Sequence, residues 1–536
     1  MELTFYGADK EVTGSCHCLT VNGKHILIDC GLQQGADETD NSRFPFYANL
    51  VDYVIITHAH IDHSGRLPLL VKQGFQGEIL TTSKTADLLD VMLRDSAHIQ
   101  QVDAEQASRK GKRAGHLPHV PLYTIDDAEA AVKLLKSCEY GECIELCEGV
   151  RVRFTDAGHL LGSASVEIWA TENNVTRKLV FSGDIGNKDQ PIIRNPQYLH
   201  AADYVVMEST YGNREHEKMK DYTKEFAKII DQTLASGGNV VIPSFAVGRT
   251  QELLFFFRKI KAQHLTPQNP DFPVYVDSPL AAEATAIYRS DLHGYADPET
   301  ENLIAHGTEP LQFSNLHITS SVEESKALNE DGIPKVIISS SGMCEAGRIR
   351  HHLKHNLWRP ECAVVFVGYQ AAGTLGRILL EGGVSSVKLF GEQIAIKAHI
   401  YNFRALSGHA DHTGLLEWIQ AFLPKPKKVF VVHGERECCE TFTAELCTKG
   451  FDAYAPDFEA SYDLLEDRFI DKGIPPEKLH PVCAGHVGKH YSSAYARLVQ
   501  AQKRLEEVVQ HNEGGTNKDL GKFADQILSL CQKWDR

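Results

Sequence analysis

Short apolar runs that end in histidine or aspartate recur along the chain, and they constrain its fold more than any other feature. Each run is rich in Val, Ile and Phe and is followed by turn residues, which is typical of a β-strand. In the first third of the chain these runs are KHILIDCG (24–31), VDYVIITHAH (51–60), VRVRFTDAGH (150–159), KLVFSGDIG (178–186) and DYVVMEST (203–210). Open α/β sheets place their sites where strands end, because a rigid scaffold there holds side chains that face a crevice. We therefore expect these polar residues to gather at one sheet edge.

A second pattern, an apolar run followed by a small-residue turn and a helix-like stretch, occupies the middle of the chain. It occurs four times, at residues 239–257, 273–287, 335–353 and 363–380. Strands that alternate with helical patterns predict βαβ units and a parallel sheet. Runs that end in histidine then return at residues 396–412 and 428–437. We therefore predict an α/β protein in which a second α/β domain is inserted into the first.

This organisation predicts four parts of the chain. The first domain has two halves at residues 1–209 and 391–460, the insertion covers 210–390, and a helical extension covers 461–536. In the extension, apolar residues at helical spacing predict two amphipathic helices that pack on the body of the protein or on another subunit. These residues are Leu498, Ala501, Leu505 and Val508 in one helix and Leu520, Phe523, Ile527 and Leu530 in the other. The two helices could serve a homodimer.

The composition is that of an ordinary globular protein, with 42% hydrophobic and 24% charged residues. The formal net charge of −16 argues against nonspecific binding of nucleic acid, although it leaves room for a local basic or metal-lined groove. The 13 cysteines form no paired CxxC motifs and are expected to be buried thiols in a reducing compartment. No apolar run reaches the about 18 residues needed to cross a bilayer, and the N-terminal segment lacks a secretory-signal profile. We therefore expect a cytoplasmic protein without membrane contacts.

A dense cluster of metal-ligand residues, HAHIDH at residues 58–63, directly follows one of the predicted strands. Three imidazoles and one carboxylate suit a borderline-soft divalent ion, and their spacing lets them diverge toward two adjacent ions. Other strand ends supply His159, Asp184 and His433. Two ions about 3.5–4 Å apart can activate water and stabilise the oxygens of a displacement. A purely structural zinc cluster is disfavoured, because Asp and His ligands leave a coordination position open more often than cysteine-closed sites do.

The order of these motifs resembles that of the metallo-β-lactamase superfamily. The resemblance implies an αββα sandwich with a site for two Zn²⁺ ions at one edge of the paired sheets. It implies that His58, His60 and His159 hold one ion, that Asp62, His63 and His433 hold the other, and that Asp184 bridges both.

The insertion, with MESTYGNREH, PSFAVGRTQE, SSSGMCEAGRIRHHLKHNL, SGHADH and VVHGE, resembles the β-CASP branch of this superfamily over roughly residues 1 to 455. No KH module is recognisable, so we expect the bacterial type. The resemblance implies cleavage of nucleic-acid phosphodiester bonds, with the substrate entering between the two domains. RNA-processing members carry histidine as the last metal ligand where DNA-repair members usually carry a small apolar residue. His433 therefore favours RNA.

The resemblance also implies a role for His409 as general acid, hydrogen-bonded to an acidic residue, Glu208. A carboxylate partner raises the pKa of an imidazole and orients it, as a proton donor at neutral pH requires. Alternatively, these two residues only cap strand ends. In the same scheme Asp62 and Asp184 are catalytic through the metal ions, and the products carry 5′-phosphate and 3′-hydroxyl ends.

Small-residue turns in the insertion are candidate phosphate contacts, since helix N-termini present free N–H groups and partial positive charge. The expected substrate-binding residues are Ser244, Arg249, Ser341, Arg348, His351 and His352. The basic stretch Arg109, Lys110, Lys112 and Arg113 is either a contact to the RNA backbone or a solvated loop.

We therefore predict a zinc-dependent endo- or 5′-exoribonuclease of RNA processing or decay. A DNA nuclease of the same fold is one alternative. A small-molecule metallohydrolase that acts on thioesters or lactams is another, but it leaves the insertion unexplained. A noncatalytic binding subunit would be expected to have lost metal ligands, whereas all seven are present.

Overall fold

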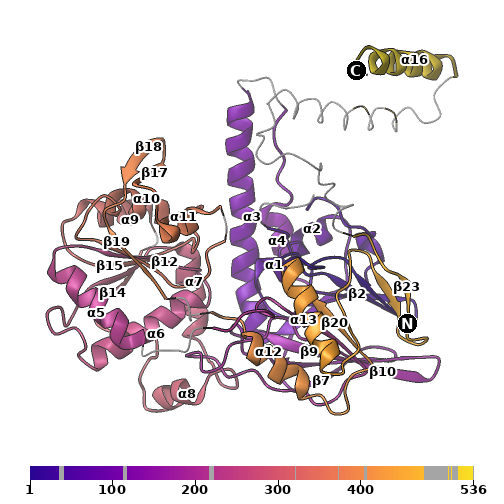
Figure 1. Ribbon diagram of the computed structural model, residues 1–536, viewed down its shortest axis with the longest axis horizontal. Coiled ribbons are helices and arrows are strands. Elements are labelled where there is room, and N and C mark those ends of the chain that lie inside the picture. Colours follow the sequence, from indigo (N-terminus) through magenta and orange to yellow (C-terminus); the bar gives the residue numbers. More distant parts are fainter. Residues whose placement is uncertain are drawn as a thin grey trace. The chain divides into compact units, whose positions relative to one another are not determined.

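The computed structural model describes residues 1–34, 41–112, 117–216, 222–319, 321–371, 373–403, 407–475, 505, 509 and 517–534. The chain divides into two units, Met1–Pro475 and Pro476–Arg536. The first unit contains three large sheets, which Figure 1 shows with their helices. No helix among these residues combines the length and the apolar character that a membrane span requires.

An eight-stranded sheet is formed by both ends of the first unit, in the order β23-β22-β1-β2-β3-β4-β5-β6. Its strands are β1 (Glu2–Phe5), β2 (His17–Val21), β3 (Lys24–Ile28), β4 (Tyr53–Ile55), β5 (Glu78–Thr82), β6 (Leu135–Cys138), β22 (Ser461–Asp463) and β23 (Arg468–Asp471). From β3 to β6 the neighbouring strands run parallel. The segment that carries the histidine cluster therefore leaves this sheet at the carboxyl end of β4.

A seven-stranded sheet has the order β21-β20-β11-β10-β9-β8-β7. Its strands are β7 (Cys143–Cys147), β8 (Val150–Asp156), β9 (Ala164–Glu172), β10 (Val175–Phe181), β11 (Tyr204–Glu208), β20 (Lys428–Val432) and β21 (Ala453–Tyr454). The strands β10, β11 and β20 run parallel, and Glu208 pairs in register with Val432. The residues that follow these three strands consequently share one sheet edge.

The two sheets pack face to face around a shared core. Phe5 and Ile28 of one sheet and Phe154 and Phe181 of the other belong to this core. Outside the first sheet lie α1 (Ile61–Ser64), α2 (Leu67–Lys72), α3 (Ser83–Lys112) and α4 (Ile125–Val132), after the short helix η1 (Ala48–Leu50). Outside the second sheet lie α12 (His412–Gln420) and α13 (Arg436–Thr448). This αββα arrangement confirms the predicted sandwich.

The inserted segment forms a six-stranded parallel sheet in the order β14-β13-β15-β12-β16-β19. Its strands are β12 (Val240–Pro243), β13 (Val274–Val276), β14 (Leu316–Ile318), β15 (Val336–Ser339), β16 (Ala363–Phe366) and β19 (His399–Asn402). One face of this sheet is covered by α5 (Tyr222–Ala235), α6 (Arg249–Ala262) and α7 (Pro279–Tyr288). The other face is covered by α10 (Ile349–Asn356) and α11 (Leu375–Glu381) (Figure 1). The segment also contains α8 (Pro298–Ala305), α9 (Val322–Glu330) and the hairpin β17 (Ser386–Leu389) with β18 (Glu392–Ala395). The parallel α/β insertion was predicted correctly.

Two segments differ from the sequence-based expectation. The run IKAHIYNF (396–403) was expected to belong to the second half of the sandwich. It contains β19, which pairs with β16 of the inserted sheet, so this sheet extends past the predicted limit at residue 390. The extension was expected to be helical from residue 461, but β22 pairs with β1 and completes the first sheet. Both strands are only three or four residues long, and β22 pairs with a strand at the opposite end of the first unit, so local patterns do not show the pairing.

The second unit contains helix α16 (Asn517–Trp534) among its described residues. Leu520, Phe523 and Ile527 are more buried than the residues between them, as the predicted amphipathic pattern requires. The first of the two predicted helices lies outside the described residues except for Leu505.

A buried tryptophan provides a test of the sandwich. Trp418 of α12 is fully buried against the second sheet, whereas Trp358 is 52% exposed. Trp418→Ala should lower the free energy of unfolding by about 3–5 kcal/mol, because it removes a large side chain from a packed layer. Trp358→Ala should change it by less than about 0.5 kcal/mol. Urea unfolding followed by circular dichroism measures both; equal effects would contradict the assignment of α12 to the core.

Candidate metal centre

Seven histidine and aspartate side chains from four segments of the chain converge at the ends of strands from both sheets of the sandwich. His58 and His60 follow β4, and His60 immediately precedes α1, which carries Asp62 and His63. The other three side chains follow strands of the second sheet. They are His159 after β8, Asp184 after β10 and His433 after β20. The predicted gathering at one edge therefore forms from both sheets.

Three histidines surround one oxygen of Asp184. Nε2 of His58 lies 3.1 Å from Nδ1 of His60, which in turn lies 3.2 Å from Nε2 of His159. Oδ2 of Asp184 lies 3.3 Å from Nε2 of His58 and 3.5 Å from Nε2 of His159. Four ligand atoms that face one point in this way can hold a divalent ion.

The second group faces the other oxygen of Asp184. Nε2 of His63 lies 3.2 Å from Oδ1 of Asp184, and Nδ1 of His433 lies 3.7 Å from it. Nε2 of His433 lies 3.4 Å from Oδ2 of Asp62. The single carboxylate of Asp184 thus has one oxygen toward each group of side chains.

Two atoms of this cluster show that its residues fit a metal ion. Nε2 of His63 and Oδ1 of Asp184 are buried, and although they lie 3.2 Å apart, neither makes a well-oriented hydrogen bond to the other or to any other described group. Buried polar atoms without partners are costly, so natural proteins keep them where an ion or another group satisfies them. Both atoms belong to ligand types that divalent transition metals prefer.

Asp29 orients His63 directly and His58 through Thr57. Its Oδ2 lies 2.7 Å from Nδ1 of His63, and its two oxygens accept hydrogen bonds from the backbone N–H and the hydroxyl of Thr57. The hydroxyl of Thr57 lies 3.1 Å from Nδ1 of His58, while Nδ1 of His159 lies 3.1 Å from the carbonyl oxygen of Gly408. Partners of this kind would leave Nε2 of each of these three rings available to hold a metal ion. Asp29 follows a predicted strand, a signal that could have identified it, but we did not predict it as a site residue.

The charges of the cluster favour metal binding. Burial lowers the pKa of His60 to about 3 and holds that of His159 well below its usual value, so both rings are neutral and able to act as ligands. Burial alone would raise the pKa of Asp184, but the neighbouring histidines outweigh it and keep the carboxylate ionised. Burial also opposes protonation of His63, yet Asp184 and Asp29 raise its pKa well above the usual value. A metal ion at His63 would therefore displace a proton.

Glu208 and His409 lie beside the cluster and contact each other. Nδ1 of His409 lies 3.2 Å from Oε1 of Glu208, and its ring packs on that of His159 with 4.4 Å between centroids. Glu208 also accepts hydrogen bonds from the backbone N–H groups of Ile185 and Thr210. Burial would lower the pKa of His409, but the carboxylates of Glu208 and Asp184 outweigh it and raise the pKa to about 9. His409 can therefore carry a proton at neutral pH.

Three of the expected substrate-binding residues already contact other residues of the inserted domain. The guanidinium of Arg249 pairs with Glu252 one turn along α6. The hydroxyl of Ser244 is buried and hydrogen-bonded to Phe245 and Thr250. His351 stacks on the ring of Phe390, with 4.2 Å between centroids. Contact of these residues with a substrate stays a prediction.

Arg348 and His352 instead meet at a buried aspartate that sequence reasoning missed. Asp277, which follows β13, accepts a hydrogen bond from Nη1 of Arg348 at 2.7 Å, and its other oxygen lies 2.6 Å from Nε2 of His352. The hydroxyl of Ser339 donates to the carbonyl oxygen of Asp277 at 2.8 Å, and that of Ser341, two residues later, donates to the carbonyl oxygen of Ala346 within the turn that follows β15. His352 therefore supports this turn from inside the domain.

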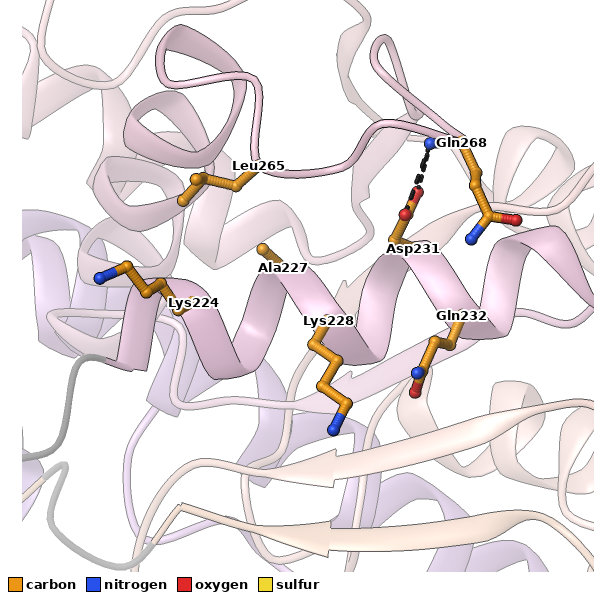
Figure 2. Close-up of a pocket in the computed structure, with 7 residues that line it drawn as sticks. All are labelled: Lys224, Ala227, Lys228, Asp231, Gln232, Leu265 and Gln268. Atoms are coloured by element: carbon orange, nitrogen blue, oxygen red, sulfur yellow. Dashed lines mark hydrogen bonds between the residues drawn. The ribbon is translucent and has the colours of Figure 1, made fainter.

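Two further features lie apart from the cluster. In the basic stretch, Arg109, Lys110 and Lys112 occupy the last turn of α3, and Arg113 lies outside the described residues. A pocket of about 270 Å³ opens on α5, with Lys224 and Lys228 at its rim. Figure 2 shows that the backbone N–H of Gln268 bonds to the carboxylate of Asp231 in this pocket. None of the seven clustered side chains lines it.

Comparison with protein families agrees with this arrangement. A model of the metallo-β-lactamase superfamily matches residues 10–131, and a model of the Beta-Casp domain matches residues 250–379. A third model, described as a Zn-dependent metallo-hydrolase RNA specificity domain, matches residues 393–456. That last segment contains His409 and His433.

Curated relatives resemble the chain over most of their length. Ribonuclease TTHA0252 from Thermus thermophilus is 36% identical over 438 residues, which cover 82% of this chain and 94% of that protein. The chain belongs to the β-CASP ribonuclease family. Transcription termination factor FttA from Methanosarcina mazei is 30% identical, with coverage of 84% and 69%. An RNase J-like protein from Methanocaldococcus jannaschii is 30% identical, with coverage of 81% and 92%. Members of this family are metal-dependent hydrolases, so the predicted family and enzyme class are confirmed.

The shared carboxylate provides a test of metal binding. Asp184→Asn removes the negative charge that faces both groups, so the metal content of the purified protein should fall to half or less of the wild-type content and hydrolysis of RNA should be lost. Asp452→Asn, at an exposed carboxylate of the same sandwich, should retain both properties. Elemental analysis by mass spectrometry measures the metal content, and circular dichroism checks the fold. A folded Asp184→Asn variant with full metal content would show that this carboxylate is not a ligand.

Proposed function

We propose that this protein is a ribonuclease that uses two Zn²⁺ ions to hydrolyse RNA phosphodiester bonds in RNA processing or decay. The single observation that carries the proposal is the position of Asp184, whose two oxygens face two separate groups of ligand atoms. His58, His60 and His159 would hold one ion, and Asp62, His63 and His433 the other. Such ions supply Lewis-acid stabilisation of phosphoryl oxygens and lower the pKa of water. A homodimer in the cytoplasm is the expected state.

Proton donation to the leaving group is assigned to His409. Its Nδ1 faces Glu208, which leaves Nε2 free to donate to the departing 3′-oxygen of the substrate. Glu208 orients the ring and stabilises its protonated form, as a general acid at neutral pH requires. This assignment leads to products with 5′-phosphate and 3′-hydroxyl ends.

The preference for RNA is supported by two observations. The last ligand of the cluster is histidine, His433, rather than a small apolar residue. The relative named ribonuclease TTHA0252 is 36% identical along nearly all of its length. A DNA nuclease of the same fold remains the second candidate, because the clustered side chains contact only the phosphate part of a nucleic acid in this scheme.

Cleavage of matched oligonucleotides tests the proposed substrate and products. With zinc present, the protein should cleave an end-labelled structured RNA and leave the DNA of the same sequence largely intact. The products should be substrates for 3′-ligation and should lose a 5′-phosphate to phosphatase. His60→Ala should abolish cleavage and retain the fold. Turnover of RNA by metal-free protein, or faster cleavage of DNA, would contradict the proposal.

The proposed role of Glu208 predicts a separation of metal binding from catalysis. Glu208→Gln keeps the hydrogen-bonding shape but removes the charge, so the rate of RNA cleavage should fall by about 10²–10⁴-fold, the usual contribution of acid–base catalysis. Zinc content and the KM for RNA should stay near the wild-type values, as measured by elemental analysis and steady-state kinetics. Loss of zinc in this variant would instead assign Glu208 to metal binding.

A further inference from the structure

Two chain crossings connect the sandwich with the inserted domain; Glu208 directly precedes the first, and the second carries His409. The first crossing leaves β11 immediately after Glu208, and its described part is Ser209–His216. The second returns from β19, and its described part, Ser407–Asp411, contains His409. The distance between the carboxylate and the imidazole therefore depends on how these two crossings are held together.

A side chain of each crossing bonds to the backbone of the other crossing. Nε2 of His216 lies 2.9 Å from the carbonyl oxygen of His409, and the backbone N–H of His216 donates to Oδ2 of Asp411 at 3.2 Å. The ring of Tyr211 lies edge-on to the rings of both histidines, with centroid distances of 4.7 Å to His216 and 6.1 Å to His409. His216 thus holds the peptide group of the residue that carries the proposed acid.

The neighbouring peptide groups of His409 are held by the sandwich. The backbone N–H of Asn187 donates to the carbonyl oxygen of Gly408 at 3.0 Å, and that of Ala410 donates to Ile185 at 2.7 Å. His216 adds the tie from the first crossing to the carbonyl oxygen of His409 itself. Rotation of this peptide group would turn the imidazole away from Glu208, so the tie restricts the motion that most affects the pair.

We infer that His216 is a positioning residue for proton donation by His409. This inference rests on the proposed function. In that hydrolysis the oxygen of water bonds to phosphorus while the P–O3′ bond breaks. The bonding electron pair stays on O3′, which takes the proton of His409. The proton that water loses passes to solvent and restores His409 before the next turnover.

A second histidine of the same region serves as a matched control. His412, at the start of α12, lies 3.2 Å from a carboxylate oxygen of Glu215 and 2.6 Å from one of Glu445. It also links the two crossings, through Glu215, but its ring nitrogens face these two carboxylates rather than the peptide group of His409. His412→Ala therefore removes a comparable contact between the two crossings. It leaves the hydrogen bond between His216 and the peptide group of His409 in place.

The experiment compares two substrates that differ in their need for a proton. One is an RNA oligonucleotide, and the other is the p-nitrophenyl ester of uridine 5′-phosphate, whose leaving group departs without protonation. His216→Ala should lower kcat for RNA by about 10- to 10²-fold, part of what acid catalysis contributes. Its kcat for the ester should stay within about threefold, and zinc content and the KM for RNA should not change. His216→Gln, which keeps a side-chain N–H donor, should recover most of the RNA rate, and His412→Ala should retain it.

The outcomes separate this inference from the proposed function. Equal losses on both substrates for His216→Ala, or the same selective loss for His412→Ala, would overturn the positioning role. If His409→Ala shows the selective loss and His216→Ala does not, the inference fails while the proposed function stands. If His409→Ala cleaves RNA at the wild-type rate, the acid assignment fails and the inference fails with it.

Discussion

The shared carboxylate of Asp184 is the interaction on which the arrangement of the site depends. Its two oxygens can face two groups of candidate ligands because β10 pairs with β11, which in turn pairs with β20, so that Glu208 and His433 reach the same edge, while β4 of the other sheet leads to the histidine cluster. Each strand pairing is a long-range contact, so the ligands come together only in the folded sandwich. Metal binding and folding of this edge are therefore thermodynamically coupled.

The inserted domain contributes to the proposed chemistry because the segment that leaves its last strand brings His409 to the metal cluster. Its sheet ends in β19, and a few residues later His409 lies between His159 and Glu208. The sandwich provides the candidate metal ligands. The inserted domain determines the position from which the second crossing, with His409, reaches them.

Much of the fold and the metal cluster could be predicted from local patterns. Strands such as β11 and β20 are almost fully buried and read as continuous apolar runs, and three histidines and an aspartate within residues 58–63 are typical of a metal site. The role of Asp29 was missed because a single aspartate after a strand is common, and that of Asp277 because its partners lie 42 to 75 residues farther along the chain. The short strands β22 and β23 were missed because they are stabilised by pairing with β1 and with each other rather than by their own composition.

The same reasoning explains why contacts with a substrate are harder to predict from sequence than metal ligands. Arg249 and His352 carry the right chemistry, but Glu252 and Asp277 occupy their polar atoms, which no spacing rule in the sequence reveals. Contacts between side chains of different segments require the assembled structure.

The route by which His409 reaches the site has a consequence for control of the reaction. The seven clustered side chains follow strands of the sandwich or lie in α1, whereas His409 lies on the segment that returns from the inserted sheet. In the proposed scheme, a change in the path of that segment would move the proton donor and leave the metal ligands in place. Metal content and cleavage activity would then vary independently of each other.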